Sequence, residues 1–515
     1  MILNTLFSAI LLPLALPNEL FPWGVALPGL VALVPALIAV RMAPDRKTAS
    51  RLGALFGAVS TALGSYWLAF FGDFSVWTIG GAVLGYTGYN YILFGFLHYL
   101  SHNGTPWYRP LRIAILWTGY EYLKSVGFLG YPWGLVAYPL AGWHTVAQTA
   151  ELLGVWGLSF MAAYVNAALA EVIVNRRFLR HLIAAMALVA VGAGFGAYRI
   201  HSIRPDDAMR VLLVQQNVDS WQPGRFSDAL SRAQQLTLET LATESGSVGA
   251  PDLVVWSETA LRRPYTGPDS FYQTTPPDLP FTRFLARLDM PLLTGAPMPA
   301  PDSSNDMTNS AILITPDGGL QGNYGKQQLV PFAESIPFWS VPAVQQFFRE
   351  VVGLYGTWVP GATTTLLEIP LADGRVLPAG APICFEDAFG WVSREMALQG
   401  ARVLINLTNN SWSRQDSAQT QHMVAARLRA IELRLPLVRG TNSGFSAVVD
   451  ATGMTVAAMP MFISDAAVME VPLYTPQWTL YLAIGDAFGQ VAAAGILLWI
   501  VLSALKESER QKSER

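Results

Sequence analysis

The sequence predicts a chain of two parts, a polytopic α-helical membrane domain and an α/β sandwich domain. The first observation is composition, because 52% of the 515 residues are hydrophobic and only 13% are charged, which is too apolar for an ordinary soluble enzyme of this length. The second is that residues 1 to about 200 form a succession of apolar stretches. The third is the alternation of strand and helix patterns from residue 205 to residue 476, which is typical of an α/β sandwich.

Eight apolar stretches are candidate transmembrane helices, and most are long enough to cross about 30 Å of hydrocarbon. They are residues 3–16, 25–40, 52–71, 77–100, 111–128, 146–174, 181–198 and 488–505. The first two are short and allow a tilted or partly interfacial position. The first has neither a basic start nor an A-x-A cleavage site, so we expect a retained span and not a signal peptide.

Lysine and arginine predict the orientation, because these residues concentrate on the cytoplasmic side of a membrane. The loops at residues 71–76 and 129–145 contain neither, and Lys124 is a mild exception. The basic residues that follow the second, fourth, sixth and eighth stretches are Arg41, Arg46, Lys47, Arg51, Arg109, Arg112, Arg176, Arg177, Arg180, Lys506, Arg510, Lys512 and Arg515. We therefore expect a multi-pass protein of the bacterial inner membrane, with both termini in the cytoplasm and the segment between the seventh and eighth spans in the periplasm.

Four segments follow from this pattern. We expect a membrane domain with seven transmembrane helices at residues 1–200, a periplasmic domain at 205–476, the eighth helix at 486–506 and a cytoplasmic tail at 507–515. The periplasmic segment is long enough to bury a full core. Its expected strands are residues 210–215, 253–256, 292–295, 311–315, 365–369, 376–384, 403–407, 437–439 and 445–449, and its expected helices are 227–243 and 419–435.

Several classes of partner are not expected. The net charge of −3, without a basic stripe, argues against nucleic acid. The sequence has no Cys and His spacing that suits a metal and no glycine-rich phosphate loop, so we expect neither a metal nor a cofactor.

Cys384 is the only cysteine in the chain and the first candidate for chemistry. It follows the apolar run Ala381-Pro382-Ile383 and precedes Phe385-Glu386-Asp387, a pattern that predicts a buried strand ending in a polar turn. A lone cysteine beside apolar residues is more often an inert core residue. Two other segments favour a nucleophile: the strand pattern at residues 252–257, which ends at Glu258, and the segment after Gly325, which begins with Lys326.

These three residue types form a self-consistent catalytic set. A thiol is a weak nucleophile until it loses its proton, and a carboxylate such as Glu258 can accept that proton when burial raises its pKa toward neutrality. The ammonium of Lys326 can stabilise the thiolate of Cys384 and then the oxyanion of the tetrahedral intermediate. The backbone N–H of Phe385 is a candidate second donor to the oxyanion.

The Glu, Lys and Cys, in this chain order, resemble the nitrilase, or carbon–nitrogen hydrolase, superfamily. The whole chain to about residue 507 is similar to the apolipoprotein N-acyltransferase family, in which a nitrilase domain lies between the seventh and eighth spans. The matching stretches are Trp256-Ser257-Glu258-Thr259-Ala260, Thr294-Gly295-Ala296-Pro297, Tyr324-Gly325-Lys326, Val330-Pro331-Phe332-Ala333-Glu334, Ile383-Cys384-Phe385-Glu386, Asn409-Asn410-Ser411-Trp412, Arg427-Leu428-Arg429-Ala430-Ile431-Glu432, Arg439-Gly440-Thr441-Asn442-Ser443-Gly444 and Gly130-Tyr131-Pro132-Trp133-Gly134. The resemblance implies a nitrilase-type αββα sandwich.

The resemblance also implies a reaction in two steps. The Cys384 thiolate takes an acyl chain from a phospholipid, usually phosphatidylethanolamine, and the α-amine of a diacylglyceryl-modified N-terminal cysteine on an apolipoprotein then takes it from the thioester. Glu258, Lys326 and Cys384 would be the triad in a protein that we expect to be a monomer. The residues implied to support the site or bind substrate are Glu334, Phe385, Glu386, Trp412 and Trp221.

This sequence departs from the family pattern at several positions. Ser257 replaces the usual proline, Phe385 the usual tyrosine, and Asn410 the usual aspartate. The loop after Asn217 is short, which puts the match of Trp221 in doubt. The departures bear on donor preference and rate, because none of them removes a triad member.

Two other functions remain open from the residues. One is a membrane-tethered amidase or nitrilase that uses the same triad with water as acceptor. The other is an inactive scaffold or a transporter, although the apolar stretches show no paired charges of the kind expected along a substrate path. Glu121 and Glu171 are expected to be isolated acids at the membrane interface.

One connecting segment is unusually aromatic. Residues 336–358 contain Phe338, Trp339, Phe347 and Phe348 and follow Glu334 closely. Ordinary packing over the sandwich is one interpretation. The other is a mobile lid that touches the membrane, because aromatic side chains sit well at headgroup depth and glycines can act as hinges.

Overall fold

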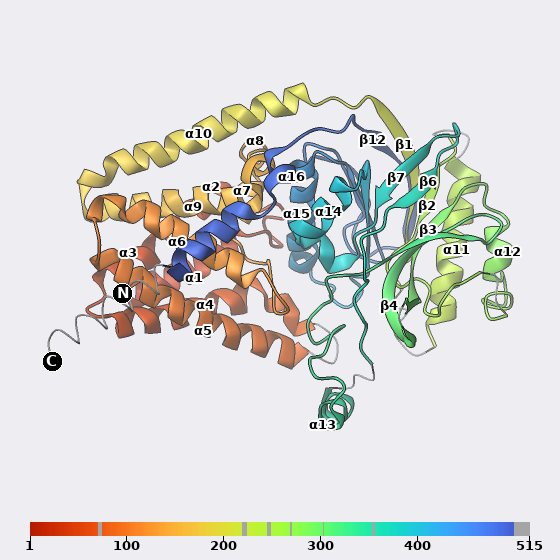
Figure 1. The fold of residues 1–515 in the computed structure, drawn as a ribbon, viewed down its shortest axis with the longest axis horizontal. Coiled ribbons are helices and arrows are strands. Elements are labelled where there is room, and N and C mark those ends of the chain that lie inside the picture. The colour runs from red at the N-terminus through yellow and green to blue at the C-terminus, as the bar shows by residue number, and fades with distance from the viewer. Residues whose placement is uncertain are drawn as a thin grey trace. The chain divides into compact units, whose positions relative to one another are not determined.

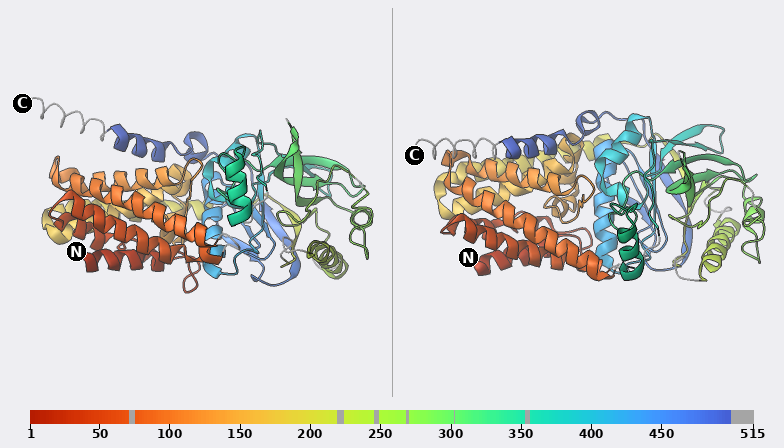
Figure 2. Two further views of the ribbon diagram at one scale, coloured as in Figure 1. Left: turned by 90° about the horizontal axis from the view of Figure 1, so that it is seen from below. Right: turned by 60° about the horizontal axis from the view of Figure 1, so that its bottom comes forward.

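The computed structural model describes residues 1–70, 75–218, 224–244, 249–267, 270–301, 303–352 and 356–498. The chain forms two compact units (Figures 1 and 2). The helical unit contains residues 1–69 and 75–200 and the segment that begins at residue 483. The sandwich unit is built from residues 201–482.

The helical unit consists of long helices joined by short helical turns. The helices are α1 (Ile2–Ala15), α2 (Ala26–Gly29), α3 (Val34–Met42), α4 (Arg46–Gly64), α5 (Ser75–His102), α6 (Arg109–Lys124), α7 (Tyr138–Ala141), α8 (His144–Ala147), α9 (Ala150–Val174) and α10 (Leu179–Ser202). Helices α4 and α5 lie side by side (Figure 1). A Cβ atom at Gly53 of α4 would lie 2.2 Å from the carbonyl oxygen of Asn90 in α5, and one at Gly57 would lie 2.3 Å from that of Tyr86. Glycines four residues apart therefore permit this close approach.

Two helices among the described residues are long and apolar enough to cross a membrane, judged by length and composition. They are Ala150–Val174 and Arg176–Ser202, and three shorter apolar helices are Ile2–Ala15, Ala26–Met42 and Ala487–Leu498. The eight predicted spans stay a prediction, and residues 499–505 of the eighth lie outside the described residues.

The expectation that Glu121 and Glu171 are isolated acids is wrong, whereas their position at the membrane interface stays a prediction. Only 1% of Glu121 and 4% of Glu171 is exposed. Glu171 forms an ion pair of 2.7 Å with Arg109. Glu121 accepts hydrogen bonds from the Trp117 indole, the Ser159 hydroxyl and the Val136 backbone N–H. Partners from distant parts of the chain satisfy both carboxylates, which is what a buried acid requires.

The sandwich unit contains two six-stranded sheets. Its strands are β1 (Asp207–Gln215), β2 (Leu253–Val255), β3 (Leu292–Ala300), β4 (Ser303–Ile314), β5 (Leu320–Gly325), β6 (Leu367–Pro370), β7 (Val376–Gly380), β8 (Val403–Thr408), β9 (Leu437–Thr441), β10 (Ala447–Val449), β11 (Thr455–Ala458) and β12 (Asp465–Leu473). The strand order is β12-β1-β2-β3-β4-β5 in the first sheet and β11-β10-β9-β8-β7-β6 in the second.

Helices cover the outer faces of the two sheets. They are α11 (Phe226–Glu244) and α12 (Phe281–Leu285) over the first sheet, and α14 (Gly390–Leu398) and α15 (Asp416–Leu433) over the second (Figure 1). The sheets face each other closely at Gly440, where a Cβ atom would lie 2.8 Å from a methyl group of Val255. This arrangement confirms the predicted α/β sandwich.

The central strands of each sheet run parallel. Strand β2 lies between β1 and β3 in the first sheet, and β8 lies between β7 and β9 in the second. Parallel strands bring their carboxyl ends to one edge of a sheet, where side chains from different segments meet. Most of the candidate active site lies at these ends.

Candidate active site

Glu258 lies just beyond the carboxyl end of β2 and is 6% exposed. Its backbone runs against β3, because the N–H of Gly295 donates to the Ser257 carbonyl and the N–H of Leu261 donates to the Gly295 carbonyl. A Cβ atom at Gly295 would lie 2.7 Å from the Cα of Glu258. Glycine is therefore needed at 295 for Glu258 to occupy this position.

Lys326 follows β5 and is completely buried. Its amino group lies 2.8 Å from Oε1 of Glu334 and 3.5 Å from Oε1 of Glu258. Its backbone is fixed on both sides, since its N–H donates to the Asn309 carbonyl and its carbonyl accepts from the N–H of Gly361. The structure thus brings together Glu258, Lys326 and Glu334, which the sequence placed on separate segments.

Asn309, in β4, joins the two carboxylates and was not identified from the sequence. Its amide group donates to Oε1 of Glu258 at 2.8 Å and to Oε1 of Glu334 at 3.2 Å. The other oxygen of Glu258 accepts from the backbone N–H of Asn409 at 2.8 Å, and the other oxygen of Glu334 accepts from that of Val330 at 2.8 Å. Both carboxylates are held in place by donors on each oxygen.

Cys384 opens a turn at the edge of the second sheet. The preceding residue, Ile383, pairs with Leu407 of β8, and residues Cys384–Ala388 form a short 3₁₀ helix. The backbone of Cys384 has a φ of 51°, in the left-handed region that costs a non-glycine residue about 1 kcal/mol or more. Such strain is common at functional sites.

The charges around Cys384 indicate how it must be activated. Burial raises the pKa of its thiol well above the usual value, the charge of Glu258 raises it further, and Lys326 opposes the rise. Burial by itself would lower the pKa of Lys326, but Glu334 and Glu258 together raise it above the usual value. The resting site therefore contains a protonated thiol and an ammonium ion, and the thiol needs a base at the moment of attack.

Glu386 is fully buried and connects the Lys326 segment to the Cys384 turn. Oε2 accepts from the backbone N–H of Ile383 at 2.7 Å. Oε1 accepts from the backbone N–H groups of Gln327 and Gln328 and from the hydroxyl of Tyr324. Burial raises the pKa of Glu386 to about 7, and the backbone hydrogen bonds from Ile383, Gln328 and Gln327 oppose this rise. These contacts connect two segments of the site, and a role of Glu386 in binding substrate stays a prediction.

The remaining predicted site residues are Phe385, Trp412 and Trp221. The Phe385 ring packs against Phe389, with centroids 4.7 Å apart. Trp412 is half-buried beyond Asn409, whose side-chain oxygen accepts from the amide of Asn442 at 3.0 Å. Trp221 lies outside the described residues.

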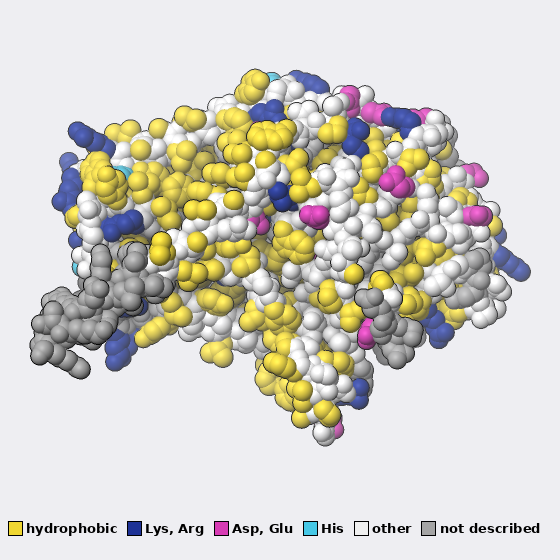
Figure 3. All heavy atoms as spheres, viewed as in Figure 1, with side chains coloured by type: hydrophobic (Ala, Val, Ile, Leu, Met, Phe, Trp, Pro, Cys, Tyr) yellow, Lys and Arg dark blue, Asp and Glu magenta, His cyan; other side chains and the backbone are white. Residues whose placement is uncertain are grey.

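The aromatic segment after Glu334 projects from the sandwich. It contains α13 (Pro342–Phe347), which lies at the tip of the projection in Figure 1. Figure 3 shows hydrophobic side chains over this tip. In the same segment of the chain, Phe338 is 77% exposed. Val341, Phe347 and Val351 are exposed as well. Large exposed apolar patches are typical of interaction surfaces, and the lid that touches the membrane stays a prediction.

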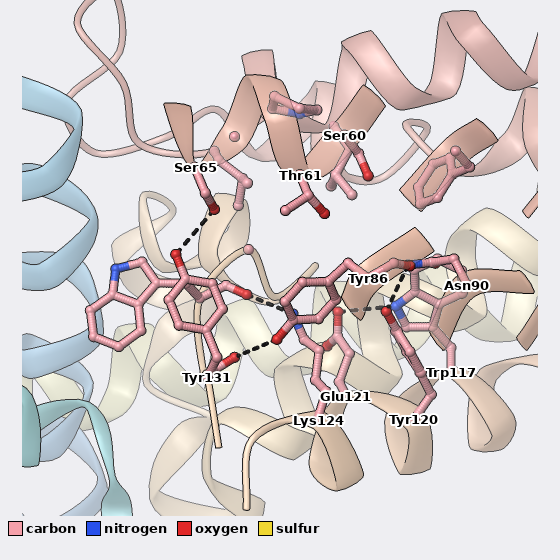
Figure 4. Close-up of a pocket in the computed structure, with 17 residues that line it drawn as sticks. Ser60, Thr61, Ser65, Tyr86, Asn90, Trp117, Tyr120, Glu121, Lys124 and Tyr131 are labelled. Atoms are coloured by element: carbon pink, nitrogen blue, oxygen red, sulfur yellow. Dashed lines mark hydrogen bonds between the residues drawn. The ribbon is translucent and has the colours of Figure 1, made fainter. Parts of the chain in front are cut away.

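The helical unit has a polar cavity of its own, of about 50 Å³, between α1, α4, α5 and α6 (Figure 4). Lys124 points into it and donates to the carbonyl of Trp133 at 2.6 Å. The Tyr131 hydroxyl donates to Ser65 at 3.1 Å, and Tyr86 donates to the carbonyl of Tyr131. These bonds hold the loop after α6, and the space suits a few water molecules. All residues that line the cavity belong to the helical unit.

Comparisons with known proteins cover both units. Residues 8–168 match the family model of the apolipoprotein N-acyltransferase N-terminal domain, and residues 210–477 match that of carbon-nitrogen hydrolase. Apolipoprotein N-acyltransferase 2 of Treponema denticola is 35% identical, over 99% of this chain and 98% of its own length. Apolipoprotein N-acyltransferase 2 of Treponema pallidum is 36% identical, over 93% and 90%. Apolipoprotein N-acyltransferase of Borreliella burgdorferi is 30% identical, over 98% and 96%.

Proposed function

Because this chain belongs to the apolipoprotein N-acyltransferase family, we propose that it transfers an acyl chain from a phospholipid to the N-terminus of an apolipoprotein through a thioester on Cys384. The observation that carries this proposal is the buried cluster of Lys326 with Glu258 and Glu334 beside the only cysteine in the chain. A cation and a base beside a thiol are what covalent acyl transfer requires.

In the first step Glu258 accepts the thiol proton as the Cys384 sulfur attacks the ester carbonyl carbon of the phospholipid. The carbonyl oxygen becomes an oxyanion, which the Lys326 ammonium and the backbone N–H of Phe385 stabilise. The intermediate collapses as the C–O bond breaks, and Glu258 returns the proton to the departing oxygen. The products are a thioester on Cys384 and a lysophospholipid.

In the second step the acceptor is the neutral α-amine of the diacylglyceryl-cysteine that begins the apolipoprotein. Its nitrogen attacks the thioester carbonyl carbon, and Glu258 accepts a proton from it. The C–S bond then breaks, the amide forms, and the proton returns to the Cys384 sulfur. The same groups serve both steps, because each passes through an oxyanion at the same carbon.

Acyl transfer is favoured over the membrane-tethered amidase by the extent of the family match. The triad alone suits either reaction, since only the acceptor differs. The relatives named as N-acyltransferases match the helical unit as well as the sandwich, and a hydrolase of small amides has no need of the helical unit.

The helical unit, on this proposal, places the reaction at the bacterial inner membrane. The eight apolar stretches would span it, with both termini in the cytoplasm and the sandwich unit in the periplasm. Two long apolar helices, the shorter apolar helices and the alternation of basic loops support this placement. The donor would be a phospholipid such as phosphatidylethanolamine, the acceptor a diacylated apolipoprotein, and the enzyme a monomer.

The proposal is tested with the full-length protein in liposomes that contain phosphatidylethanolamine with a labelled acyl chain. A synthetic diacylated lipopeptide with a free N-terminal amine serves as acceptor, and the same lipopeptide with an acetylated amine serves as the control. We expect label on the free-amine lipopeptide, an equal amount of lysophospholipid, and no label on the acetylated one. Release of labelled free fatty acid without lipopeptide labelling would support a hydrolase instead.

A further inference from the structure

Two polar side chains contact the carbonyl oxygen of Cys384. This oxygen accepts a hydrogen bond from the amide of Asn406, in β8, at 3.2 Å. It also lies 3.3 Å from Nε2 of His422, in α15. Both partners come from segments distant from the turn that contains the nucleophile.

His422 is itself held by a buried ion pair. Its Nε2 lies 2.7 Å from Oδ1 of Asp387, and Oδ2 of Asp387 accepts from Nε of Arg439 at 3.1 Å. Asp387 and Arg439 are fully buried, and His422 is 5% exposed. A carbonyl oxygen and an ionised carboxylate are both acceptors only, so Nε2 must carry the proton. The His422 N–H therefore points at Asp387 and at the Cys384 carbonyl together.

The peptide between Cys384 and Phe385 connects this group to the reaction. In a planar trans peptide the C=O and N–H bonds point in opposite directions. An anchor on the Cys384 carbonyl thus also fixes the direction of the Phe385 N–H, which is the proposed backbone donor to the oxyanion. Anchoring has a purpose here, because Cys384 adopts a left-handed conformation with φ of 51° that a non-glycine residue leaves when nothing holds it.

We propose that His422, held by Asp387 and Arg439, is a positioning residue that works with Asn406 to aim the Phe385 N–H at the oxyanion. This inference rests on the proposed acyl transfer, because the direction of the Phe385 N–H affects the rate only if an oxyanion forms at Cys384. Ordinary core stabilisation is the alternative. It predicts that loss of the group weakens every reaction of the site alike, or lowers stability alone.

Two probes of the full-length protein in detergent separate these possibilities. Burst release of p-nitrophenol from p-nitrophenyl butyrate reports acylation of Cys384, which passes through an oxyanion. Alkylation of Cys384 by iodoacetamide reports access to the thiol and its ionisation, and it has no oxyanion. A residue that aims an oxyanion donor affects the first rate and spares the second.

The test compares His422→Leu with His422→Gln, whose amide nitrogen can take the place of Nε2 as donor. We expect His422→Leu to slow acylation about 10- to 100-fold, a part of the loss that follows removal of a whole oxyanion donor, and to leave alkylation within about 3-fold. His422→Gln should recover most of the acylation rate. Equal losses of both rates, an unchanged acylation rate in His422→Leu, or failure of His422→Gln to recover would overturn the proposal.

A second variant covers the case in which His422→Leu does not fold. Asp387→Asn keeps the shape and leaves His422 without its charged partner, so acylation should fall about 3- to 10-fold. The charge of Asp387 raises the pKa of the Cys384 thiol, so alkylation should be unchanged or faster in this variant. No change in acylation contradicts the proposal. If the wild-type protein is alkylated but never acylated, the proposed acyl transfer fails first and this inference falls with it. An acylated wild type with insensitive variants overturns the positioning role alone.

Discussion

The ammonium of Lys326 and the carboxylate of Glu334 form an ion pair of 2.8 Å inside the sandwich. Glu258 is farther from the same ammonium, at 3.5 Å. Glu334 is therefore the closer counter-ion of Lys326, and Glu258 is the carboxylate that we propose as the base. The cluster contains two carboxylates for one ammonium, which explains why it raises the pKa of Lys326. Burial raises the pKa of Cys384, and the charge of Glu258 raises it further.

Glu258→Gln keeps the shape of the side chain and removes the base. We expect acylation of Cys384 by phospholipid to fall by about two to four orders of magnitude. Stopped-flow or quench-flow measurement of lysophospholipid release checks this. Glu368→Gln, at an exposed carboxylate of β6, is the matched control and should leave the rate unchanged. A Glu258→Gln enzyme that acylates at the wild-type rate would show that another group is the base.

Lys326→Ala removes the cation that opposes the rise in the pKa of Cys384. Acylation should fall by a factor similar to that of Glu258→Gln, because the oxyanion loses its charged partner. Alkylation by iodoacetamide should also slow at a given pH, because a higher pKa leaves less thiolate.

The pH dependence of alkylation checks whether the resting Cys384 is protonated. A raised thiol pKa means that the wild-type rate should climb about tenfold per pH unit from about pH 7 to about pH 9 without a plateau. A plateau near neutral pH would mean that the resting cysteine is already a thiolate, and Glu258 would then have no proton to accept.

Glu334→Gln tests the division of roles between the two carboxylates. The buried ammonium of Lys326 loses its closest counter-ion, and breaking a buried pair costs about 3–5 kcal/mol. We expect a lower melting temperature and acylation reduced at least about tenfold, with the base still present. Circular dichroism melts and the burst assay measure the two effects. If Glu334→Gln is as stable as wild type while Glu258→Gln is destabilised, the counter-ion is Glu258 and the roles are exchanged.

The exposed aromatic segment should matter for lipid donors and not for soluble ones. Phe338→Ser combined with Trp339→Ser should slow acylation by phospholipid in liposomes and largely spare acylation by p-nitrophenyl butyrate. The expectation rests on the 77% exposure of Phe338 and on the affinity of aromatic side chains for headgroup depth. Met454→Ser, at another exposed apolar residue of the sandwich, is the control. Equal losses with both donors, or a matching fall in melting temperature, would favour ordinary packing.

Each residue of the proposed triad follows a local signal in the sequence. Glu258 and Cys384 come at the ends of short apolar runs, and Lys326 follows a glycine at a turn. Asn309 and Asn409 carry no such signal, because an amide inside or after a strand becomes a ligand of Glu258 only through the pairing of distant strands.

Local sequence patterns also failed to predict features of the fold that depend on distant segments. Strand β12 (Asp465–Leu473) was not predicted, because its burial comes from antiparallel pairing with β1 more than 200 residues earlier. Glu121 was expected to be an isolated acid, but Ser159 and the backbone of Val136 donate hydrogen bonds to it. Local periodicity identifies elements and strand ends, whereas the partners of buried polar groups depend on long-range contacts.

The most direct measurement is mass spectrometry of the full-length protein purified from bacterial membranes, on the peptide that contains Cys384. We expect this peptide to carry a fatty acyl chain that hydroxylamine removes, as a thioester does. Cys384→Ser and Cys384→Ala should fold and carry no acyl chain, because a hydroxyl has a far higher pKa than a thiol and a methyl group cannot attack. An unmodified Cys384 in an enzyme that still acylates lipopeptide, or normal turnover by Cys384→Ala, would contradict the covalent mechanism.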